Sequence, residues 1–364
     1  RAGDGQWTSL KQVRVEAGQS VAVPFTSEEK GEWVRVICDR TTETTVSFNY
    51  TSDDKRPTGY DAMFCGLTPV ESSTTTGGLL YGLGNDRRAL GLLANRTTDG
   101  QTAEVGYYEM GDRLELVRKE DPETATFVRE QFAIPQQVVS IEAGSVLVVD
   151  DAGRRWRLPL GQDLYRPLTD QGQLRICREV ATERDLFSCM GTFYELPAEN
   201  ADGYAKMRPV ATHPFRIQDY ASYRGMLVLT GVTPEEGKDN PHVVVSADGK
   251  AAVWVGVIDD LWELGKPLGQ GGPWKDAQVK AGEKSDPYLM ACYDQKSLTL
   301  EADRAATITL EVDPTGNGDW MAYQQWNLSA GQACQFDFPA GFQARWIRFV
   351  SDRDAQVTTW LEYK

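Results

Sequence analysis

Short runs in which apolar and polar residues alternate recur along the whole chain. The clearest are WVRVICDR at 33–40 and WIRFVSDR at 346–353, where bulky apolar residues hold every second position. A period of two is typical of antiparallel strands that bury one face. The best helical candidate, ETATFVREQFA at 123–133, is short and runs into Pro135. The pattern therefore predicts an all-β protein of many short strands.

Two of these patterned segments are copies of one module. Residues 5–50 and 318–363 align without a gap at an offset of 313, and 13 of the 46 aligned positions are identical. Internal repeats fix an architecture more firmly than local propensity does. Because one copy opens the chain and the other closes it, we expect a ring in which the first and last units are neighbours.

The offset selects among the all-β architectures. Divided by seven, it gives about 45 residues, the usual size of a four-stranded propeller blade. The sequence therefore predicts a single β-propeller domain over residues 1–364 with seven blades, or six as the alternative. We expect the two copies to be homologous blades that are adjacent at ring closure. The rival arrangement has two domains, with a β-sandwich at each end of a smaller barrel.

Composition and charge limit the classes of partner and the cellular location that the chain can have. The formal net charge is −15, which argues against nucleic acid and anionic membranes because both need a basic face. No apolar run is long enough for a membrane span. The chain starts at Arg1 without a leader-like segment, so we expect a periplasmic or secreted protein whose leader has been removed. The six cysteines lack metal-finger spacing and leave free thiols or one or two disulfides open.

One stretch, RPVATHPFRIQDYASYRG at 208–225, gathers polar and aromatic groups. On a strand–loop–strand crossing it would reach the central mouth of a propeller. His and Tyr can transfer protons, and Arg can neutralise a carboxylate. The alternative is an ordinary blade with a hydrogen-bonded His and surface ion pairs. The candidates for proton transfer are His213, Tyr220 and Tyr223, and those for substrate binding are Arg216, Asp219 and Arg224.

A second set of candidates follows. His242 precedes a predicted hairpin and is a further candidate for proton transfer. Asp259 and Trp262 lie in DDLWELGKP, and Trp274 and Lys275 tip a long glycine-rich loop of the kind that contacts substrates. The tryptophans could stack on sugar rings, or pack in the core. No metal-ligand motif is present and no cofactor is expected, although a divalent cation stays open.

Three phrases resemble a known group of proteins. HPFRIQDYASYRGMLVLTGV, HVVVSADGKAAVWVGVIDDLWELGKPLGQGGPW and KSDPYLMACYD, within residues 190–364, resemble bacterial β-propeller proteins that accompany polysaccharide degradation. Carbohydrate-active propellers more broadly include rhamnosidase-like hydrolases and ulvan-type lyases, which are similar in architecture only. The zinc sites of such lyases use more histidines than the two found here.

Two functions of different classes stand at this point. The first is a carbohydrate-active enzyme, a glycoside hydrolase or polysaccharide lyase, acting on an acidic or deoxy-sugar glycan. In the lyase form, Tyr220 or Tyr223 with His213 moves protons while Arg216 or Arg224 holds the uronate carboxylate. In the hydrolase form, His213, His242 or an acidic residue protonates the leaving oxygen. The alternative is a non-catalytic propeller that binds a glycan or a protein, with Trp274 gripping the ligand.

Overall fold

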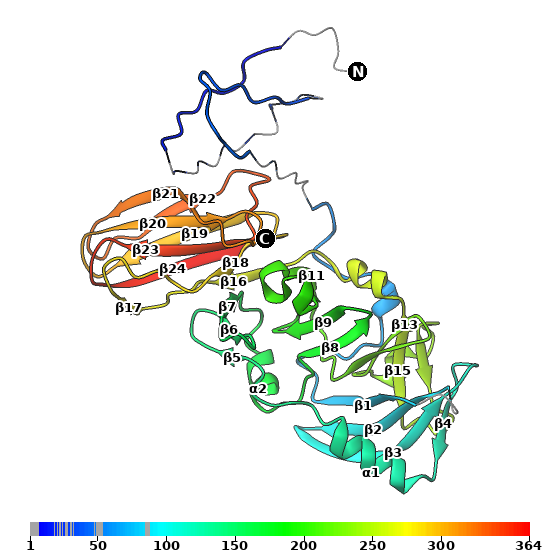
Figure 1. Ribbon diagram of the computed structural model, residues 1–364. Coiled ribbons are helices and arrows are strands. Elements are labelled where there is room, and N and C mark those ends of the chain that lie inside the picture. Colours follow the sequence, from blue (N-terminus) through cyan, green and yellow to red (C-terminus); the bar gives the residue numbers. More distant parts are fainter. Residues whose placement is uncertain are drawn as a thin grey trace. The chain divides into compact units, whose positions relative to one another are not determined.

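The chain divides into two compact units. The computed structural model describes residues 7–17, 19, 21, 23, 25, 28, 29, 31, 33–46, 48, 54–83 and 88–364. Unit 1 comprises Arg1–Asp54 and Gly271–Lys364, and unit 2 comprises Lys55–Gln270. Both consist mainly of strands in several small sheets (Figure 1). The all-β class is therefore confirmed, whereas a single propeller domain, its blade number and its closure stay predictions.

The described residues of unit 2 form three four-stranded antiparallel sheets and a further run of three antiparallel strands. The first, in the order β1-β2-β3-β4, consists of Thr74–Gly82, Leu90–Thr98, Gln101–Met110 and Leu116–Lys119. The second, in the order β11-β10-β9-β8, consists of Arg208–Thr212, Thr192–Pro197, Arg184–Cys189 and Cys177–Ala181. The third, in the order β12-β13-β15-β14, consists of Tyr220–Tyr223, Met226–Leu229, Ala252–Gly256 and Val243–Val245. The further run, in the order β7-β6-β5, consists of Arg155–Leu158, Val146–Val149 and Ser140–Ile141.

Helices in unit 2 are short. They are α1 (Pro122–Gln131), α2 (Tyr165–Asp170) and α3 (Pro234–Gly237), with 3-10 turns η1 (Ala62–Phe64), η2 (Glu199–Ala201), η3 (Gly203–Lys206) and η4 (Ile258–Leu264). The short helical candidate of the sequence is α1. It begins at Pro122, and Asp121 caps it by accepting the N–H of Thr124 at 3.0 Å. None of the described helices is long and apolar enough to cross a membrane.

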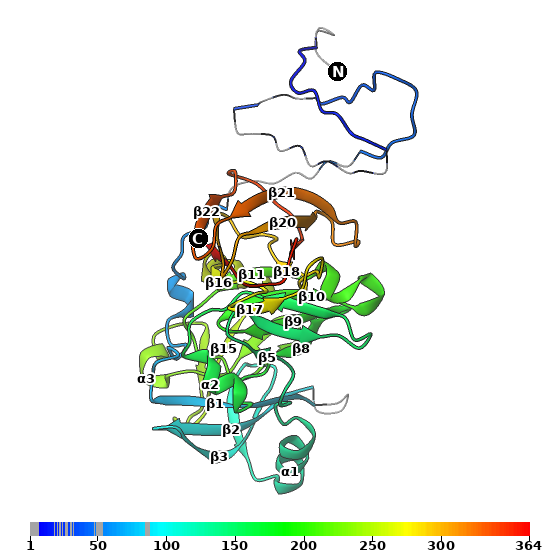
Figure 2. The same ribbon diagram turned by 90° about the vertical axis from the view of Figure 1, so that its left-hand side faces the viewer.

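The core of unit 2 follows from the alternation along its strands. Val128 of α1 packs against Leu93 and Tyr107 on one face of the β1–β4 sheet, and Figure 2 shows α1 beside β3. A separate apolar cluster includes Trp254 of β15, whose ring stacks on Phe64 at 5.0 Å. Burying large aromatic side chains supplies much of the free energy that orders such small sheets.

Unit 1 folds into two antiparallel sheets. One has the order β21-β20-β23-β18, with bounds Met321–Leu328, Ala306–Asp313, Trp346–Ser351 and Tyr288–Leu289. The other has the order β24-β19-β22, with bounds Ala355–Tyr363, Lys296–Ala302 and Cys334–Asp337, and β17 (Ala277–Val279) pairs with β24. A short strand β16 (Gly269–Gly271) lies at the boundary of the two units along the chain. The ring centres of Trp326 in β21 and Phe336 in β22 lie 5.2 Å apart. Side chains of the two sheets therefore pack against each other as in a β-sandwich.

The C-terminal copy of the repeat is not a four-stranded blade. Its strands enter the two sheets alternately, with β21 and β23 in one sheet and β22 and β24 in the other. The interpretation of the 46-residue module as one blade is therefore wrong for this copy. Period-two alternation indicates that a strand has a buried face, but it does not say which sheet the strand joins.

The N-terminal copy is described only in part. Thirteen of its positions, 5, 6, 18, 20, 22, 24, 26, 27, 30, 32, 47, 49 and 50, lie outside the described residues. The others are not assigned to strands. The expectation that the two copies superpose and meet at ring closure therefore stays a prediction.

Candidate functional site

The first strands of three sheets in unit 2 lie against one another. β1, β8 and β12 each stand at an edge of their own sheet, and β12 contacts both of the others. Asp219, which precedes β12, accepts the N–H of Leu80 in β1 at 2.9 Å. Its carboxylate also pairs with Arg178 of β8 at 3.2 Å and with Arg175. Because Asp219 is fully buried, these bonds join the three sheets in the interior.

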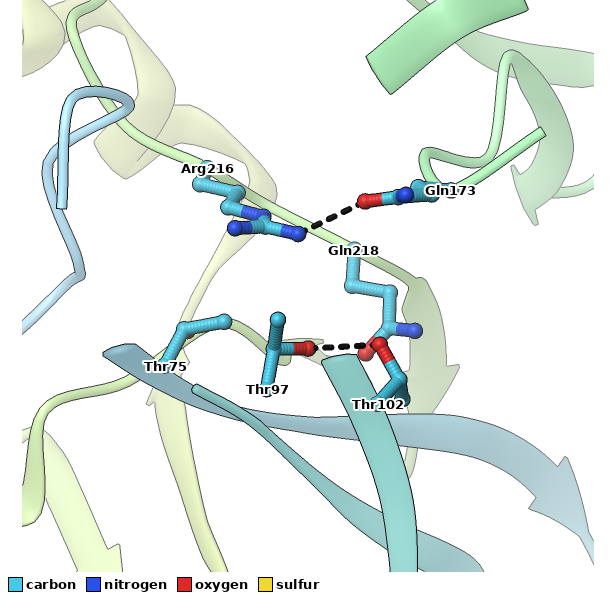
Figure 3. A pocket seen from close by; sticks show the side chains of 6 residues that line it. All are labelled: Thr75, Thr97, Thr102, Gln173, Arg216 and Gln218. Atoms are coloured by element: carbon cyan, nitrogen blue, oxygen red, sulfur yellow. Dashed lines mark hydrogen bonds between the residues drawn. The ribbon is translucent and has the colours of Figure 1, made fainter. Parts of the chain in front are cut away.

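A small polar pocket opens beside the N-terminal ends of these strands (Figure 3). Its cavity volume is about 20 Å³, which is room for a water molecule or one small polar group but not for a sugar ring. The start of β1, the turn between β2 and β3, and the residues before β8 and β12 form its walls. The lining side chains are Thr75, Thr97, Thr102, Gln173, Arg216 and Gln218. All six can donate a hydrogen bond and none is acidic, which suits a hydroxyl-rich or anionic ligand.

Arg216 is the only charged group that lines the pocket. Its side chain is buried, and its Nη2 donates to Oε1 of Gln173 at 2.7 Å (Figure 3). It forms no ion pair with a carboxylate in the part of the chain that the structure describes. Burial lowers the pKa of the guanidinium from its ordinary value, but arginine keeps its charge in proteins. A buried positive charge without a counter-charge is costly, and an anion in the pocket would neutralise it.

The backbone holds Arg216 in place from two sides. Its N–H donates to the carbonyl of Thr68 at 2.7 Å. Its own carbonyl lies against Gly231, where an added Cβ would come within 2.1 Å of the oxygen. Gly231 also has a φ of +101°, which only glycine adopts without strain. The orientation of Arg216 is therefore built into the fold.

Gln218 is fixed by two glycines in β1. Its Oε1 accepts the N–H of Gly78 at 2.8 Å. A Cβ at Gly77 would lie 1.9 Å from that oxygen, so the side chain needs glycine at this position. With Oε1 engaged, the Nε2 amide has no hydrogen-bond partner among the described residues and remains able to donate.

The threonines give the pocket a floor of hydroxyl groups. Thr97 and Thr102 share a hydrogen bond of 2.9 Å between the ends of β2 and β3 (Figure 3). Thr75 donates to Oγ1 of Thr68 at 2.9 Å. Because each hydroxyl has both a donor and acceptor lone pairs, these groups keep further capacity to bind a ligand hydroxyl.

His213 lies in the interior. Its Nδ1 accepts the N–H of Phe215 at 3.2 Å, and its ring lies 4.8 Å from that of Phe193. Its Nε2 is buried without a hydrogen-bond partner among the described residues. Burial lowers the pKa of His213 to about 3, so the ring is neutral at physiological pH. It does not line the pocket.

The two candidate tyrosines are bonded to the backbone. Tyr220 is fully buried, and its hydroxyl lies 2.9 Å from the carbonyl of Ile176 and 2.8 Å from that of Leu186. Burial raises the pKa of Tyr220 well above its ordinary value. The hydroxyl of Tyr223 donates to the carbonyl of Arg88 at 2.8 Å, and burial raises its pKa too. Both rings hold elements together.

Arg224 and His242 lie elsewhere in unit 2. Arg224 is exposed, follows β12 and pairs with Asp112 at 2.7 Å. Nδ1 of His242 lies 2.8 Å from the carbonyl of Val255, and its ring stacks on Trp254 at 5.6 Å. Neither lines the pocket.

Trp262 and Asp259 belong to η4. Asp259 is exposed, and Trp262 keeps 38 % of its surface accessible. The guanidinium of Arg56 lies 4.6 Å from the Trp262 ring centre, and that of Arg208 lies 5.9 Å away. These cations occupy the aromatic surface that a sugar would need for stacking.

Trp274 and Lys275 belong to unit 1. Trp274 is buried, and its backbone N–H donates to Oγ1 of Thr359 at 3.3 Å. The centre of its ring lies 6.2 Å from that of Phe349. The ammonium of Lys275 lies 5.4 Å from the ring centre of Trp360. The sequence left open whether Trp274 stacks on a sugar or packs in the core. The structure places the Trp274 side chain in the core.

Of the predicted site residues, only Arg216 lines the pocket. Sequence reasoning missed the neutral side chains that complete it, namely Thr75, Thr97, Thr102, Gln173 and Gln218. One signal was available: the run TTTGGLL places two adjacent glycines inside a strand, which indicates close approach of another chain segment. Among the described residues, no group of three or more His, Cys, Asp or Glu side chains could hold a metal ion.

Comparison with known proteins leaves the family open. No protein-family model matches the chain, and no curated protein matches it. Among solved structures, a glycoside hydrolase family 43 arabinoxylan arabinofuranohydrolase from Bacillus subtilis, in complex with cellotetraose, is 9 % identical over 79 % of each chain, with a TM-score of 0.19.

Two further matches are weaker still. An exo-β-1,3-galactanase from Phanerochaete chrysosporium is 9 % identical over 82 % of this chain and 80 % of its own, with a TM-score of 0.16. A sucrose-6-phosphate hydrolase from Lactobacillus gasseri is 12 % identical over 82 % and 92 %, with a TM-score of 0.13. TM-scores this low carry no argument about fold or function.

Proposed function

We propose that unit 2 recognises an acidic glycan and that Arg216 binds a carboxylate of one of its sugars. The observation that supports this is a buried guanidinium that faces a polar pocket without a carboxylate partner among the described residues. Arginine binds carboxylates through paired charge-assisted hydrogen bonds. The surrounding hydroxyl and amide groups can donate further hydrogen bonds to the oxygens of that carboxylate, and the rest of the sugar would lie outside the small cavity.

The pocket favours recognition over catalysis. A glycosidase needs two carboxyl groups on either side of the bond that it cleaves, and none of the six lining residues is acidic. A lyase needs a proton-transfer group at the sugar, whereas His213 and Tyr220 are buried and do not line the pocket. Cleavage by a hydrolase or lyase mechanism stays a prediction, and binding is the activity proposed here.

The test uses polygalacturonate and the same polymer with its carboxyl groups reduced. We expect the full chain to bind polygalacturonate and to bind the reduced polymer at least about tenfold more weakly. Arg216→Met should weaken binding about 10- to 100-fold, which corresponds to losing a hydrogen bond to a charged group. Affinity is measured by isothermal titration calorimetry at low and moderate salt.

The matched control is Arg224→Met, which removes an exposed arginine of the same unit that is already paired with Asp112. It should leave the affinity unchanged. Equal affinity for both polymers, or an Arg216→Met variant that binds as the parent does, would overturn the proposal. Absorbance of unsaturated uronate and release of reducing ends, followed in the same samples, detect lyase or hydrolase activity.

A further inference from the structure

Three arginine side chains on neighbouring segments of unit 2 share one carboxylate. Asp219 is fully buried and pairs with Arg175, and with Arg178 at 3.2 Å. The backbone N–H of Arg175 donates to the carbonyl of Gln218 at 2.8 Å, which places these pairs beside the segment that carries Arg216. Among the described residues, Asp219 is the only carboxylate that pairs with any of the three guanidinium groups. Three positive charges therefore face one negative charge.

The pocket presents free hydrogen-bond donors beside the unmatched charge. The guanidinium of Arg216 uses Nη2 on Gln173 and keeps its other N–H donors, and Nε2 of Gln218 has no partner among the described residues. Figure 3 shows the guanidinium across the pocket from Thr75 and Thr97. Because Arg216 is only 7 % exposed, bulk water solvates its charge poorly. A buried cation surrounded by donors favours a negative ligand.

The size of the cavity limits which anion can enter. A volume of about 20 Å³ holds roughly one water molecule. Chloride is a single atom of comparable size, whereas sulfate and phosphate each carry four oxygens and are too large. Amide, hydroxyl and guanidinium donors can replace the hydration shell of a monovalent anion, and the guanidinium charge offsets its desolvation.

We propose that this pocket is a chloride site. The ion accepts hydrogen bonds from Arg216, the Gln218 amide and the threonine hydroxyls, and it neutralises the buried guanidinium. A glycan carboxylate enters the same small space, so chloride and glycan exclude each other; this second part rests on the function proposed above. Chloride concentration then controls how readily the chain binds an acidic glycan.

Chloride nuclear magnetic resonance on the full chain tests the site, because chloride that exchanges with a protein site gives a broadened line. We expect excess line width that saturates with chloride and is displaced by bromide. Methanesulfonate should not displace it, because that anion is monovalent but too large for the cavity. Arg216→Met should weaken chloride binding at least about tenfold, as expected for losing a hydrogen bond to a charged group.

Two further variants serve as a second test and a control. Thr97→Val keeps the charge and removes one hydroxyl, and it should weaken chloride binding about 2- to 10-fold. Arg224→Met also removes one positive charge, but from an exposed side chain paired with Asp112, and it should change nothing. Absence of saturable broadening in the parent, equal broadening in Arg216→Met, or equal displacement by bromide and methanesulfonate would overturn the chloride site.

Polygalacturonate titrations separate this inference from the proposed function. At a chloride concentration ten times its dissociation constant, the apparent affinity should be about tenfold weaker than in methanesulfonate of equal ionic strength. Glycan binding that depends on Arg216 but is equal in the two salts would overturn the shared site and leave the proposed function standing. Chloride binding by a chain that binds no polygalacturonate in either salt would support the chloride site and overturn the glycan proposal.

Discussion

The guanidinium of Arg348 lies 4.1 Å from the ring centre of Trp320, across the strand that carries Glu311. Trp320 precedes the edge strand β21 and Arg348 belongs to β23, with β20 between them. Arg35 and Trp7 make the same contact at the same distance. A cation–π pair that recurs at equivalent positions indicates that the two copies share more than a hydrophobic pattern.

The two equivalent tryptophans should differ strongly in their effect on stability. Trp346→Ala should lower the free energy of unfolding of unit 1 by about 3–5 kcal/mol, because it empties a fully buried position. Trp33→Ala should change it by less than about 0.5 kcal/mol, because the ring is mostly exposed. Urea unfolding followed by circular dichroism measures both. Similar losses in the two variants would contradict the difference in burial.

Substitution of two buried arginines should affect the free energy of unfolding differently. Arg175→Met should lower the free energy of unfolding by about 3–5 kcal/mol, because it leaves the buried Asp219 carboxylate with one partner fewer. Arg216→Met should leave stability unchanged or raise it, because it removes a buried charge that has no counter-ion among the described residues.

Thermal unfolding of the two arginine variants beside the parent protein measures the effect. A large loss of stability for Arg216→Met would show that this guanidinium is a structural group, and the glycan proposal would lose its basis.

Sequence patterns predicted the strands well and their partners poorly. The alternation in WIRFVSDR located β23, whereas the structural equivalence of the two repeat copies stays a prediction. Blade assignment failed for the C-terminal copy because a strand's partner depends on the chain segment that inserts beside it, here β19 and β20. That choice is non-local, and periodicity does not encode it.

The candidate site shows the same limit. His213, Tyr220 and Tyr223 are close in sequence, but closeness in sequence does not decide which way side chains point, because successive residues of a strand face opposite sides. His213 and Tyr220 lie in the core, where the backbone bonds the Tyr220 hydroxyl and Nδ1 of His213 but leaves Nε2 of His213 without a partner among the described residues. Arg216 and Gln218 of this segment line the pocket, while the other lining residues come from three other segments.

His213 should make the protein sensitive to acid. Its pKa in the folded state is about 3, below the ordinary 6.5. Between these pH values His213 is protonated in the unfolded chain but not in the native state. The free energy of unfolding therefore falls as pH drops from about 6.5 toward 3. The slope approaches about 1.4 kcal/mol per pH unit. Urea unfolding between pH 7.5 and 4.5 should show this slope in the parent and a shallower one in His213→Gln. Parallel profiles would show that His213 titrates alike in both states.

Lys296 should make the free energy of unfolding depend on pH in the alkaline range. The side chain is buried at the start of β19, and its Nζ donates to the carbonyls of Tyr293 at 2.5 Å and Phe342 at 2.9 Å. Burial lowers the pKa of the ammonium from 10.5 to about 8. Desolvation therefore outweighs the attraction of these carbonyl dipoles for the charged form.

The sign of the effect follows from proton binding. Between pH 8 and 10.5 the unfolded chain keeps the proton while native Lys296 releases it, so the unfolded state binds more protons and stability rises with pH. The gain should reach up to about 3 kcal/mol across this window and be absent in Lys296→Met. Urea unfolding of both proteins at half-unit steps from pH 7.5 to 10 isolates it, because the other titrating groups are common to both. A parent protein that loses stability relative to Lys296→Met as pH rises would mean that the carbonyls hold the ammonium charged, with a pKa above its ordinary value.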